Sequence, residues 1–156
     1  SINNGATTMW ERWDSFTKKD GFHKDGMNSF NHYAYGAIGR WMYERIAGIK
    51  PTKVAYKEIE IAPIPGGPLT AAAATYNSPY GEVSSNWKLV DNQFILDIKV
   101  PPNTTAKVTV PANTPKSIKV NGVAFIESAA IKLLNKTENA FIFEVKPGAY
   151  SFETNY

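Results

Sequence analysis

Between residues 58 and 153, apolar and polar residues alternate repeatedly, and this feature most restricts what the chain can fold into. A two-residue period is typical of strands that have one face in a core and one face in water. The alternating segments are 58–61, 83–89, 94–100, 106–110, 141–145 and 150–153. Asn121-Gly122 lies between two apolar segments and predicts a type I′ hairpin. About seven to nine short antiparallel strands with regular turns predict a two-sheet, jelly-roll-like β-sandwich.

The first fifty residues have a different period. Apolar residues recur at steps of three and four, which predicts one helix over about 8–19 and a longer one over about 29–48. Gly48 and Pro51 end this pattern. We therefore predict an α+β chain, with a helical hairpin in residues 1–50 followed by the β-sandwich in residues 51–156. The apolar faces also place Trp41 and Trp87 in the predicted core.

Composition excludes several classes of function. The formal net charge is only +3 and the basic residues are scattered, so no nucleic-acid partner is indicated. No apolar stretch approaches the ~18 residues of a membrane span. The chain has no cysteine, and its two histidines have no standard metal-ligand spacing. No glycine-rich phosphate loop is present either, so we expect no cofactor and no metal ion. The absence of cysteine does not fix the cellular compartment.

Glu11 and His32 are the candidate functional side chains, because each is set among aromatic residues as in a sugar site. Trp10, next to Glu11, is a candidate sugar platform. Each residue also has a structural interpretation. Thr8-x-x-Glu11 matches a helix capping box, and a lone histidine on an aromatic helix is usually structural. A glycosidase needs two carboxylates, and only Glu11 is a good candidate here, so the chain resembles part of an enzyme.

Two longer motifs carry a family resemblance. Residues 6–15 (ATTMWERWDS) and 28–36 (NSFNHYAYG) resemble the C-terminal end of the catalytic domain of bacterial α-L-rhamnosidases, glycoside hydrolase family 78. Residues 69–73, 78–87 and 100–106 are similar to the C-terminal β-domain of the same family. The resemblance covers nearly the whole chain.

The resemblance implies that residues 1–50 are the last helices of an (α/α)6 barrel and that residues 51–156 are the C-terminal β-sandwich. Such enzymes hydrolyse terminal α-L-rhamnosides with inversion. Glu11 would be the general base and His32 would contact the rhamnose. The general acid lies upstream in the family, so the chain alone is expected to be inactive. Its expected partners are a rhamnoside, the upstream part of the same enzyme chain, and a second copy bound through exposed helix faces.

A second interpretation treats the sandwich as a non-catalytic module that binds carbohydrate or only braces the barrel. Tyr56, Tyr76 and Tyr80 are the candidate aromatic residues for sugar binding.

Overall fold

The computed structural model describes the backbone of residues 1–156 and every side chain except that of Tyr35. The chain divides into two compact units, Ser1–Trp41 and Met42–Tyr156. The predicted α+β class and the β-sandwich are confirmed. In the described part of the chain, no helix is long and apolar enough to cross a membrane.

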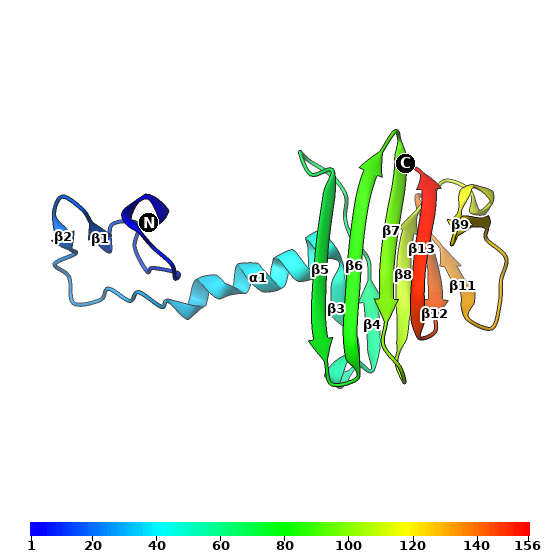
Figure 1. Cartoon of the computed structure of the whole chain (residues 1–156), viewed down its shortest axis with the longest axis horizontal. Helices are drawn as coiled ribbons and strands as arrows, with labels where there is room; N and C mark the ends of the chain where they lie inside the picture. The colour runs from blue at the N-terminus through cyan, green and yellow to red at the C-terminus, as the bar shows by residue number, and fades with distance from the viewer. The chain divides into compact units, whose positions relative to one another are not determined.

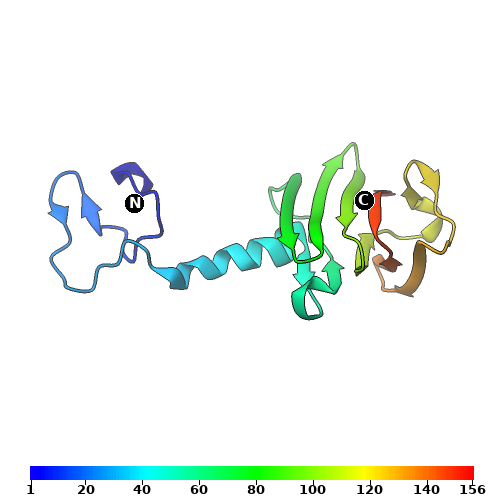
Figure 2. The same cartoon turned by 60° about the horizontal axis from the view of Figure 1, so that its bottom comes forward.

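The second unit is the β-sandwich, whose two sheets are visible as two layers in Figures 1 and 2. One sheet has six strands in the order β10-β9-β13-β7-β6-β5, and the other has five in the order β11-β12-β8-β4-β3. The strands of the six-stranded sheet are β5 (Ala71–Ser78), β6 (Gly81–Val90), β7 (Gln93–Val100), β9 (Lys119–Val120), β10 (Val123–Ala124) and β13 (Gly148–Asn155). Those of the other are β3 (Ile49–Pro51), β4 (Glu58–Ile61), β8 (Thr105–Pro111), β11 (Ile131–Lys136) and β12 (Ala140–Val145).

The core lies between the two sheets and follows the alternation in the sequence. In β7 the residues Phe94, Leu96, Ile98 and Val100 are buried, whereas Asp97 and Lys99 are exposed. The inward residues of β12 and β13 add a group of phenylalanines, and the rings of Phe143 and Phe152 lie 5.6 Å apart. Each alternating segment predicted from the sequence is a strand, and Asn121-Gly122 forms the predicted hairpin between β9 and β10.

A row of alternating charges crosses the outer face of the five-stranded sheet. Strand register places Lys132 opposite Glu144, Glu144 opposite Lys107, Lys107 opposite Glu60 and Glu60 opposite Lys50. Opposite charges on neighbouring strands attract each other, and the row keeps this face polar. The β4–β8 pairing is parallel, which departs from the all-antiparallel prediction.

Three strands of the sandwich were not predicted. β5 consists largely of alanines, so it has no contrast between apolar and polar residues. β3 has three residues, and β11 has one buried residue, at its first position. Periodicity cannot reveal strands whose two faces are chemically alike or too short to repeat.

The predicted helix over residues 8–19 is wrong. The first unit contains instead the short 3₁₀ turn η1 (Ile2–Asn4) and a two-stranded sheet of β1 (Phe16–Thr17) and β2 (Gly21–Phe22). Its aromatic residues make edge-to-face contacts with distant partners: Phe16 with Phe22 at 5.2 Å, Phe22 with Phe30 at 5.7 Å, and Phe30 with Trp10 at 5.1 Å. These aromatic residues therefore pack through tertiary contacts and do not form the apolar face of a helix.

The second predicted helix is present over a shorter range. It comprises the 3₁₀ segment η2 (Tyr33–Gly36), the α-helix α1 (Ala37–Trp41) and the π-helical segment η3 (Met42–Ala47). Trp41 is 52% exposed, and α1 contributes no buried residue, so the prediction that Trp41 is in the core is wrong. The helical hairpin of the prediction is therefore a single helix.

The end of the helix is fixed to the sandwich by side chains of β6. The Trp87 indole N–H donates to the carbonyl of Ile46 at 2.7 Å, and the Ser85 hydroxyl donates to that of Ala47 at 2.6 Å. These bonds satisfy carbonyls that a helix end otherwise leaves unpaired. Trp87 is fully buried, as predicted. Gly48 then turns the chain into β3 with a φ of 84°.

The turns η4 (Val54–Tyr56) and η5 (Pro115–Ser117) lie in the connections β3–β4 and β8–β9.

Candidate active site

The two motifs of the first unit are joined by backbone hydrogen bonds. The Glu11 N–H donates to the Ser29 carbonyl at 2.8 Å, and the His32 N–H donates to the Met9 carbonyl at 2.8 Å. Residues 9–11 and 29–32 therefore run side by side. This pairing brings the Glu11 and His32 side chains together, although they are distant in the sequence.

The carboxylate of Glu11 is positioned by these partners. Its Oε2 accepts a hydrogen bond from the Ser29 N–H at 2.8 Å, and its Oε1 lies 3.8 Å from His32 Nε2. The side chains of Glu11 and His32 are 20% and 27% exposed, so both remain accessible to a small molecule. The capping-box interpretation of Glu11 is wrong, because no helix begins at Thr8 and the Thr8 hydroxyl donates to the carbonyl of Phe30.

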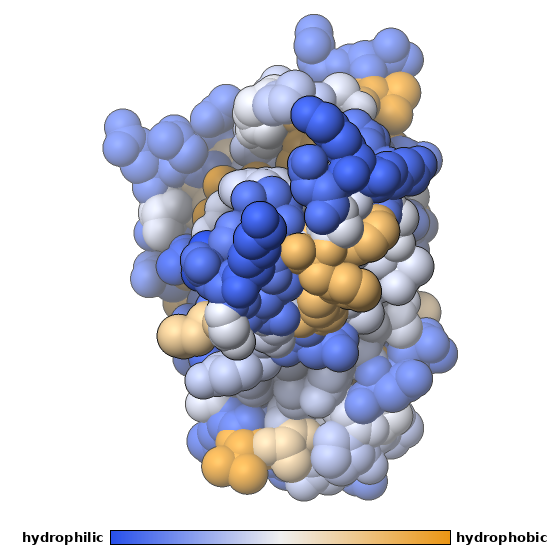
Figure 3. Space-filling model, turned by 90° about the vertical axis from the view of Figure 1, so that its left-hand side faces the viewer, coloured by the Kyte–Doolittle hydropathy of each residue, from blue (hydrophilic) through white to orange (hydrophobic). Residues whose placement is uncertain are grey.

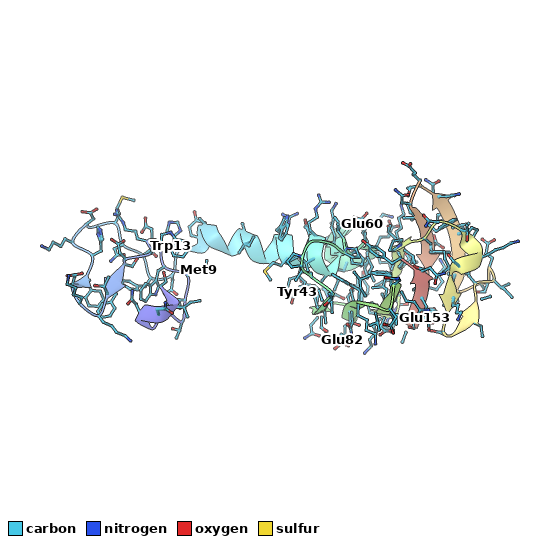
Figure 4. The ribbon with its side chains drawn as sticks, turned by 90° about the horizontal axis from the view of Figure 1, so that it is seen from above. Met9, Trp13, Tyr43, Glu60, Glu82 and Glu153 are labelled. Carbon is cyan, nitrogen blue, oxygen red and sulfur yellow. The ribbon has the colours of Figure 1, made fainter. Side chains whose placement is uncertain are left out.

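An apolar cavity of about 470 Å³ adjoins the Glu11 carboxylate. Met9, Trp10 and Trp13 form part of its wall, and Figure 4 shows Met9 and Trp13 close to each other in the first unit. Trp10 is held by its edge-to-face contact with Phe30, whereas Trp13 is 87% exposed. The cavity is also lined by Ser1, Ile2, Ala6, Thr8 and Ile38. Among the described lining residues, Glu11 is the only carboxylate, and His32 lies beside Glu11 outside the lining.

Contacts between charged side chains hold the loop between the two motifs in place. The Arg12 guanidinium lies 3.0 Å from the Asp25 carboxylate and donates from Nε to the Met27 carbonyl at 3.2 Å. His23 lies between Asp14 and Asp25, 3.6 Å and 3.8 Å from their carboxylates. Within the described residues, no cluster of three or more histidine, cysteine, aspartate or glutamate side chains has an arrangement that would hold a metal ion. These contacts give the loop a structural role.

This arrangement has a definite chemical capacity. A carboxylate with one oxygen held by a backbone N–H keeps its orientation while it accepts a proton or binds a hydroxyl group. Indole rings beside it supply apolar surface for a ring-shaped ligand. A second carboxyl group, which a glycosidase also needs, is not among the described residues that line the cavity.

Comparison with known families matches two segments of the chain. Residues 48–125 match the bacterial alpha-L-rhamnosidase C-terminal domain, and residues 1–46 match the bacterial alpha-L-rhamnosidase 6 hairpin glycosidase domain. The chain belongs to the bacterial α-L-rhamnosidase family. It corresponds to the C-terminal part of such an enzyme, as the resemblance of its motifs implied.

Individual relatives agree with this placement. An α-L-rhamnosidase of Formosa agariphila is 50% identical over 100% of this chain, which spans 17% of that protein. An α-L-rhamnosidase of Streptomyces avermitilis is 44% identical over 97% of this chain, which spans 14% of it. The crystal structure of the Streptomyces avermitilis α-L-rhamnosidase complexed with L-rhamnose has a TM-score of 0.81 at 42% identity, covering 98% of this chain and 14% of that one.

The sequence did not reveal how the site is held together. Glu11 and His32 stood out as residue types, but their proximity follows from backbone hydrogen bonds between the two motifs. A backbone donor such as the Ser29 N–H has no side-chain signature. The spacing of Met9 and Ile38 predicts helix faces, whereas both residues line the cavity. Their apolar spacing was the available signal, and it was ambiguous between a core and a cavity wall.

Proposed function

We propose that this chain supplies the general-base half of an inverting glycoside hydrolase that releases terminal α-L-rhamnose from rhamnosides. In this proposal Glu11 accepts the proton of the attacking water, His32 binds the sugar, and Trp10 provides an apolar platform for it. The observation that carries the proposal is the pairing of Glu11 with the Ser29 N–H and with His32 beside an indole-lined cavity. Membership of the α-L-rhamnosidase family supports the choice of sugar.

The proposed mechanism requires a second carboxyl group. In an inverting glycosidase the two groups stand roughly 6.5–9.5 Å apart, which leaves room for the water beside the anomeric carbon. The second group protonates the leaving oxygen. We place this acid in the upstream part of the same enzyme chain, since the present chain spans 14–17% of its relatives. We further propose that residues 1–50 close the catalytic barrel and that residues 51–156 form its C-terminal sandwich, which the two family matches support.

The test uses the Streptomyces avermitilis α-L-rhamnosidase with its corresponding segment replaced by these 156 residues. Glu11→Gln keeps the size of the side chain and its hydrogen bond to Ser29, but it removes the base. We expect hydrolysis of an aryl α-L-rhamnoside to fall by about 10²–10⁴-fold. Asp20→Asn is the matched control, because Asp20 is an exposed carboxylate of the same unit and bonds Thr17. An equal loss in both variants, or no loss in Glu11→Gln, contradicts the assignment.

The stereochemical part is tested on the same chimera. Proton NMR recorded in the first minutes of the reaction identifies which anomer of rhamnose is released first. The β-anomer is expected for inversion, and initial release of the α-anomer contradicts it. For the 156-residue chain alone we expect no measurable hydrolysis, because it has neither the acid nor the remaining wall of the site.

The exposed apolar side chains of the first unit support the partner proposal. Figure 3 shows a group of hydrophobic side chains bordered by hydrophilic ones. In the first unit the large exposed apolar residues are Ile2, Met9, Trp13, Phe22, Met27, Tyr33, Ile38 and Trp41. Apolar surface on this scale usually marks an interface. We propose that the upstream part of the enzyme covers it, and that the isolated chain self-associates through it. Light scattering at increasing concentration tests this, and a monomer throughout contradicts it.

A further inference from the structure

The loop between β3 and β4 holds an unusual turn at one end of the sandwich. Ala55 and Tyr56 are consecutive residues in the left-handed region, with φ values of 58° and 64°. The Lys57 N–H donates to the Val54 carbonyl at 3.2 Å and closes the turn. Turns with two such residues normally contain Asn-Gly, because other side chains are strained there. Strain of this kind is often found where a loop clamps a ligand.

The turn places one aromatic ring on another. The rings of Tyr56 and Tyr76 are stacked, with centroids 4.3 Å apart and an interplanar angle of 26°. Tyr56 leads into the five-stranded sheet through β4, and Tyr76 lies in β5 at the edge of the six-stranded sheet. The pair therefore links the loop before β4 with the edge strand of the six-stranded sheet. Tyr76 is 38% exposed, so part of its ring surface faces solvent.

A cavity of about 490 Å³ adjoins this pair. Its walls are residues 51–56 of the loop, Tyr76, and Pro79 of the β5–β6 turn. Most of these residues are apolar or aromatic, and the polar side-chain groups are the Thr52 hydroxyl, the Lys53 ammonium and the hydroxyls of Tyr56 and Tyr76. A mainly apolar wall with a few polar groups is the usual composition of a small-molecule site. Lys53 Nζ lies 2.5 Å from Glu58 Oε1, so its charge is already balanced.

We propose that this cavity is a carbohydrate subsite in which Tyr76 stacks against one neutral pyranose ring. The flat ring suits the apolar face of a sugar, and Thr52 and Lys53 can bond its hydroxyl groups. The balanced charge of Lys53 disfavours an anionic ligand. The existence of the subsite is independent of Glu11. Its use for a further sugar unit of the same rhamnoside rests on the proposed function.

The outer face of the six-stranded sheet is a weaker candidate for the same role. Strand register places Ala73, Asn86, Asp97 and Ser151 in one row across its centre. In this described row no side chain is aromatic, so a sugar ring has no flat apolar partner there. The Tyr56–Tyr76 pair supplies that partner at the end of the sandwich.

The test is an amide-resolved NMR titration of the ¹⁵N-labelled 156-residue chain with L-rhamnose, and in parallel with D-glucose. We expect shifts at residues 52–57 and 76–78, with a dissociation constant in the millimolar range. Tyr76→Leu keeps an apolar side chain in β5 but removes the flat face, and should weaken binding about tenfold or more. Tyr76→Phe keeps the ring and should retain binding. Tyr80→Ala is the control, since the Tyr80 ring contacts Lys57 at 5.0 Å outside the cavity lining.

Each outcome is decisive for the subsite. Shifts at residues 52–57 that disappear in Tyr76→Leu and persist in Tyr76→Phe and Tyr80→Ala support it. Absence of shifts there, or equal binding in Tyr76→Leu, overturns it. If Tyr76→Leu loses its dispersed spectrum, the comparison of wild type with Tyr76→Phe and Tyr80→Ala decides instead. Equal binding in these three proteins supports the subsite. Weaker binding in Tyr80→Ala than in Tyr76→Phe contradicts it. Shifts confined to Glu11, Ser29 and His32 would support the catalytic proposal while overturning this one.

Discussion

Replacing Gly48 by alanine should be among the most damaging single substitutions in the sandwich. Gly48 joins the helix to β3 with a φ of +84°, and its carbonyl accepts the Ala62 N–H at 2.9 Å. A Cβ at this position would lie 2.1 Å from Pro63 N and 2.4 Å from the carbonyl carbon of Ala62. Both atoms belong to the backbone of the neighbouring strand connection, so no side-chain rotation can relieve the overlap.

The magnitude has three parts. The left-handed conformation costs a non-glycine residue about 1–2 kcal/mol. Forcing a methyl group into packed surroundings typically costs about 1–3 kcal/mol. Displacing the strand connection puts the Ala62–Gly48 hydrogen bond at risk, which is worth about 1 kcal/mol. We therefore expect Gly48→Ala to lower the free energy of unfolding by about 3–6 kcal/mol, a large share of the 5–15 kcal/mol of a typical domain.

Gly122→Ala provides the matched control. Gly122 has a similar φ of +79°, but nothing lies within 4 Å of the position its Cβ would occupy. It should therefore lose only the conformational part, about 1–2 kcal/mol. Urea unfolding followed by circular dichroism compares the two variants. If both lose the same free energy within about 0.5 kcal/mol, the steric reasoning at Gly48 is refuted.

Three further predictions use the same chain. Trp87→Phe keeps a buried ring but leaves the carbonyl of Ile46 without its donor, so urea unfolding should show a loss of about 1–3 kcal/mol, and an unchanged stability would contradict the role of this bond. Ala55→Gly relieves a left-handed φ, so the free energy of unfolding should rise by up to about 1 kcal/mol after the entropy that glycine adds to the unfolded chain, and a decrease would show that the turn is not strained. The hydrogen bond from Lys146, and its charge, lower the pKa of Glu144. Because the pKa of Glu144 is depressed in the folded chain, the stabilisation is present above the ordinary pKa of a glutamate and is lost as the pH falls through the lowered pKa. Lys146→Met should therefore raise the Glu144 pKa in an NMR titration. An unchanged pKa would exclude the Lys146–Glu144 pair as the cause.

The sandwich was predictable because burial on one face leaves a simple record. In β7 and β12 every second residue is apolar and enters the core, so hydrophobicity alone reports the strand and its orientation. The alanines of β5 leave no such record, and its position depends on pairing with β6 along its whole length. Pairing between strands is a property of two segments together, which the composition of one segment does not contain.

The first unit shows the opposite case. Met9, Trp10, Trp13 and Phe16 have helical spacing, yet the rings of Trp10 and Phe16 contact those of Phe30 and Phe22, and Trp13 is exposed. Periodicity states that residues are apolar at certain intervals, but not which surface will cover them. Periodicity could not predict the proximity of Glu11 and His32 either, because it depends on hydrogen bonds between backbone segments that are distant in the sequence. The family motifs pointed to both residues without explaining their contact.

Burial also separates the two units energetically. None of the described apolar side chains of Ser1–Trp41 is fully buried, whereas the sandwich has a continuous core that includes Trp87, Phe94 and Phe143. Fixing the backbone costs about 1–2 kcal/mol per residue, and burial returns about 25 cal/mol for each Å² of apolar surface. Partial burial of a few rings cannot offset that cost over the whole first unit. The Glu11–His32 site should therefore depend on apolar surface that the rest of the enzyme provides.

Hydrogen exchange measures this dependence directly. In the isolated chain, the amides of Glu11 and His32 should exchange quickly, although both donate hydrogen bonds in the structure, while those of β7 should exchange slowly. In the chimera with the Streptomyces avermitilis enzyme, the same two amides should become protected. Protection of Glu11 and His32 in the monomeric chain alone would mean that the first unit is stable by itself. The inactivity that we propose for the isolated chain would then have to rest on the missing acid alone.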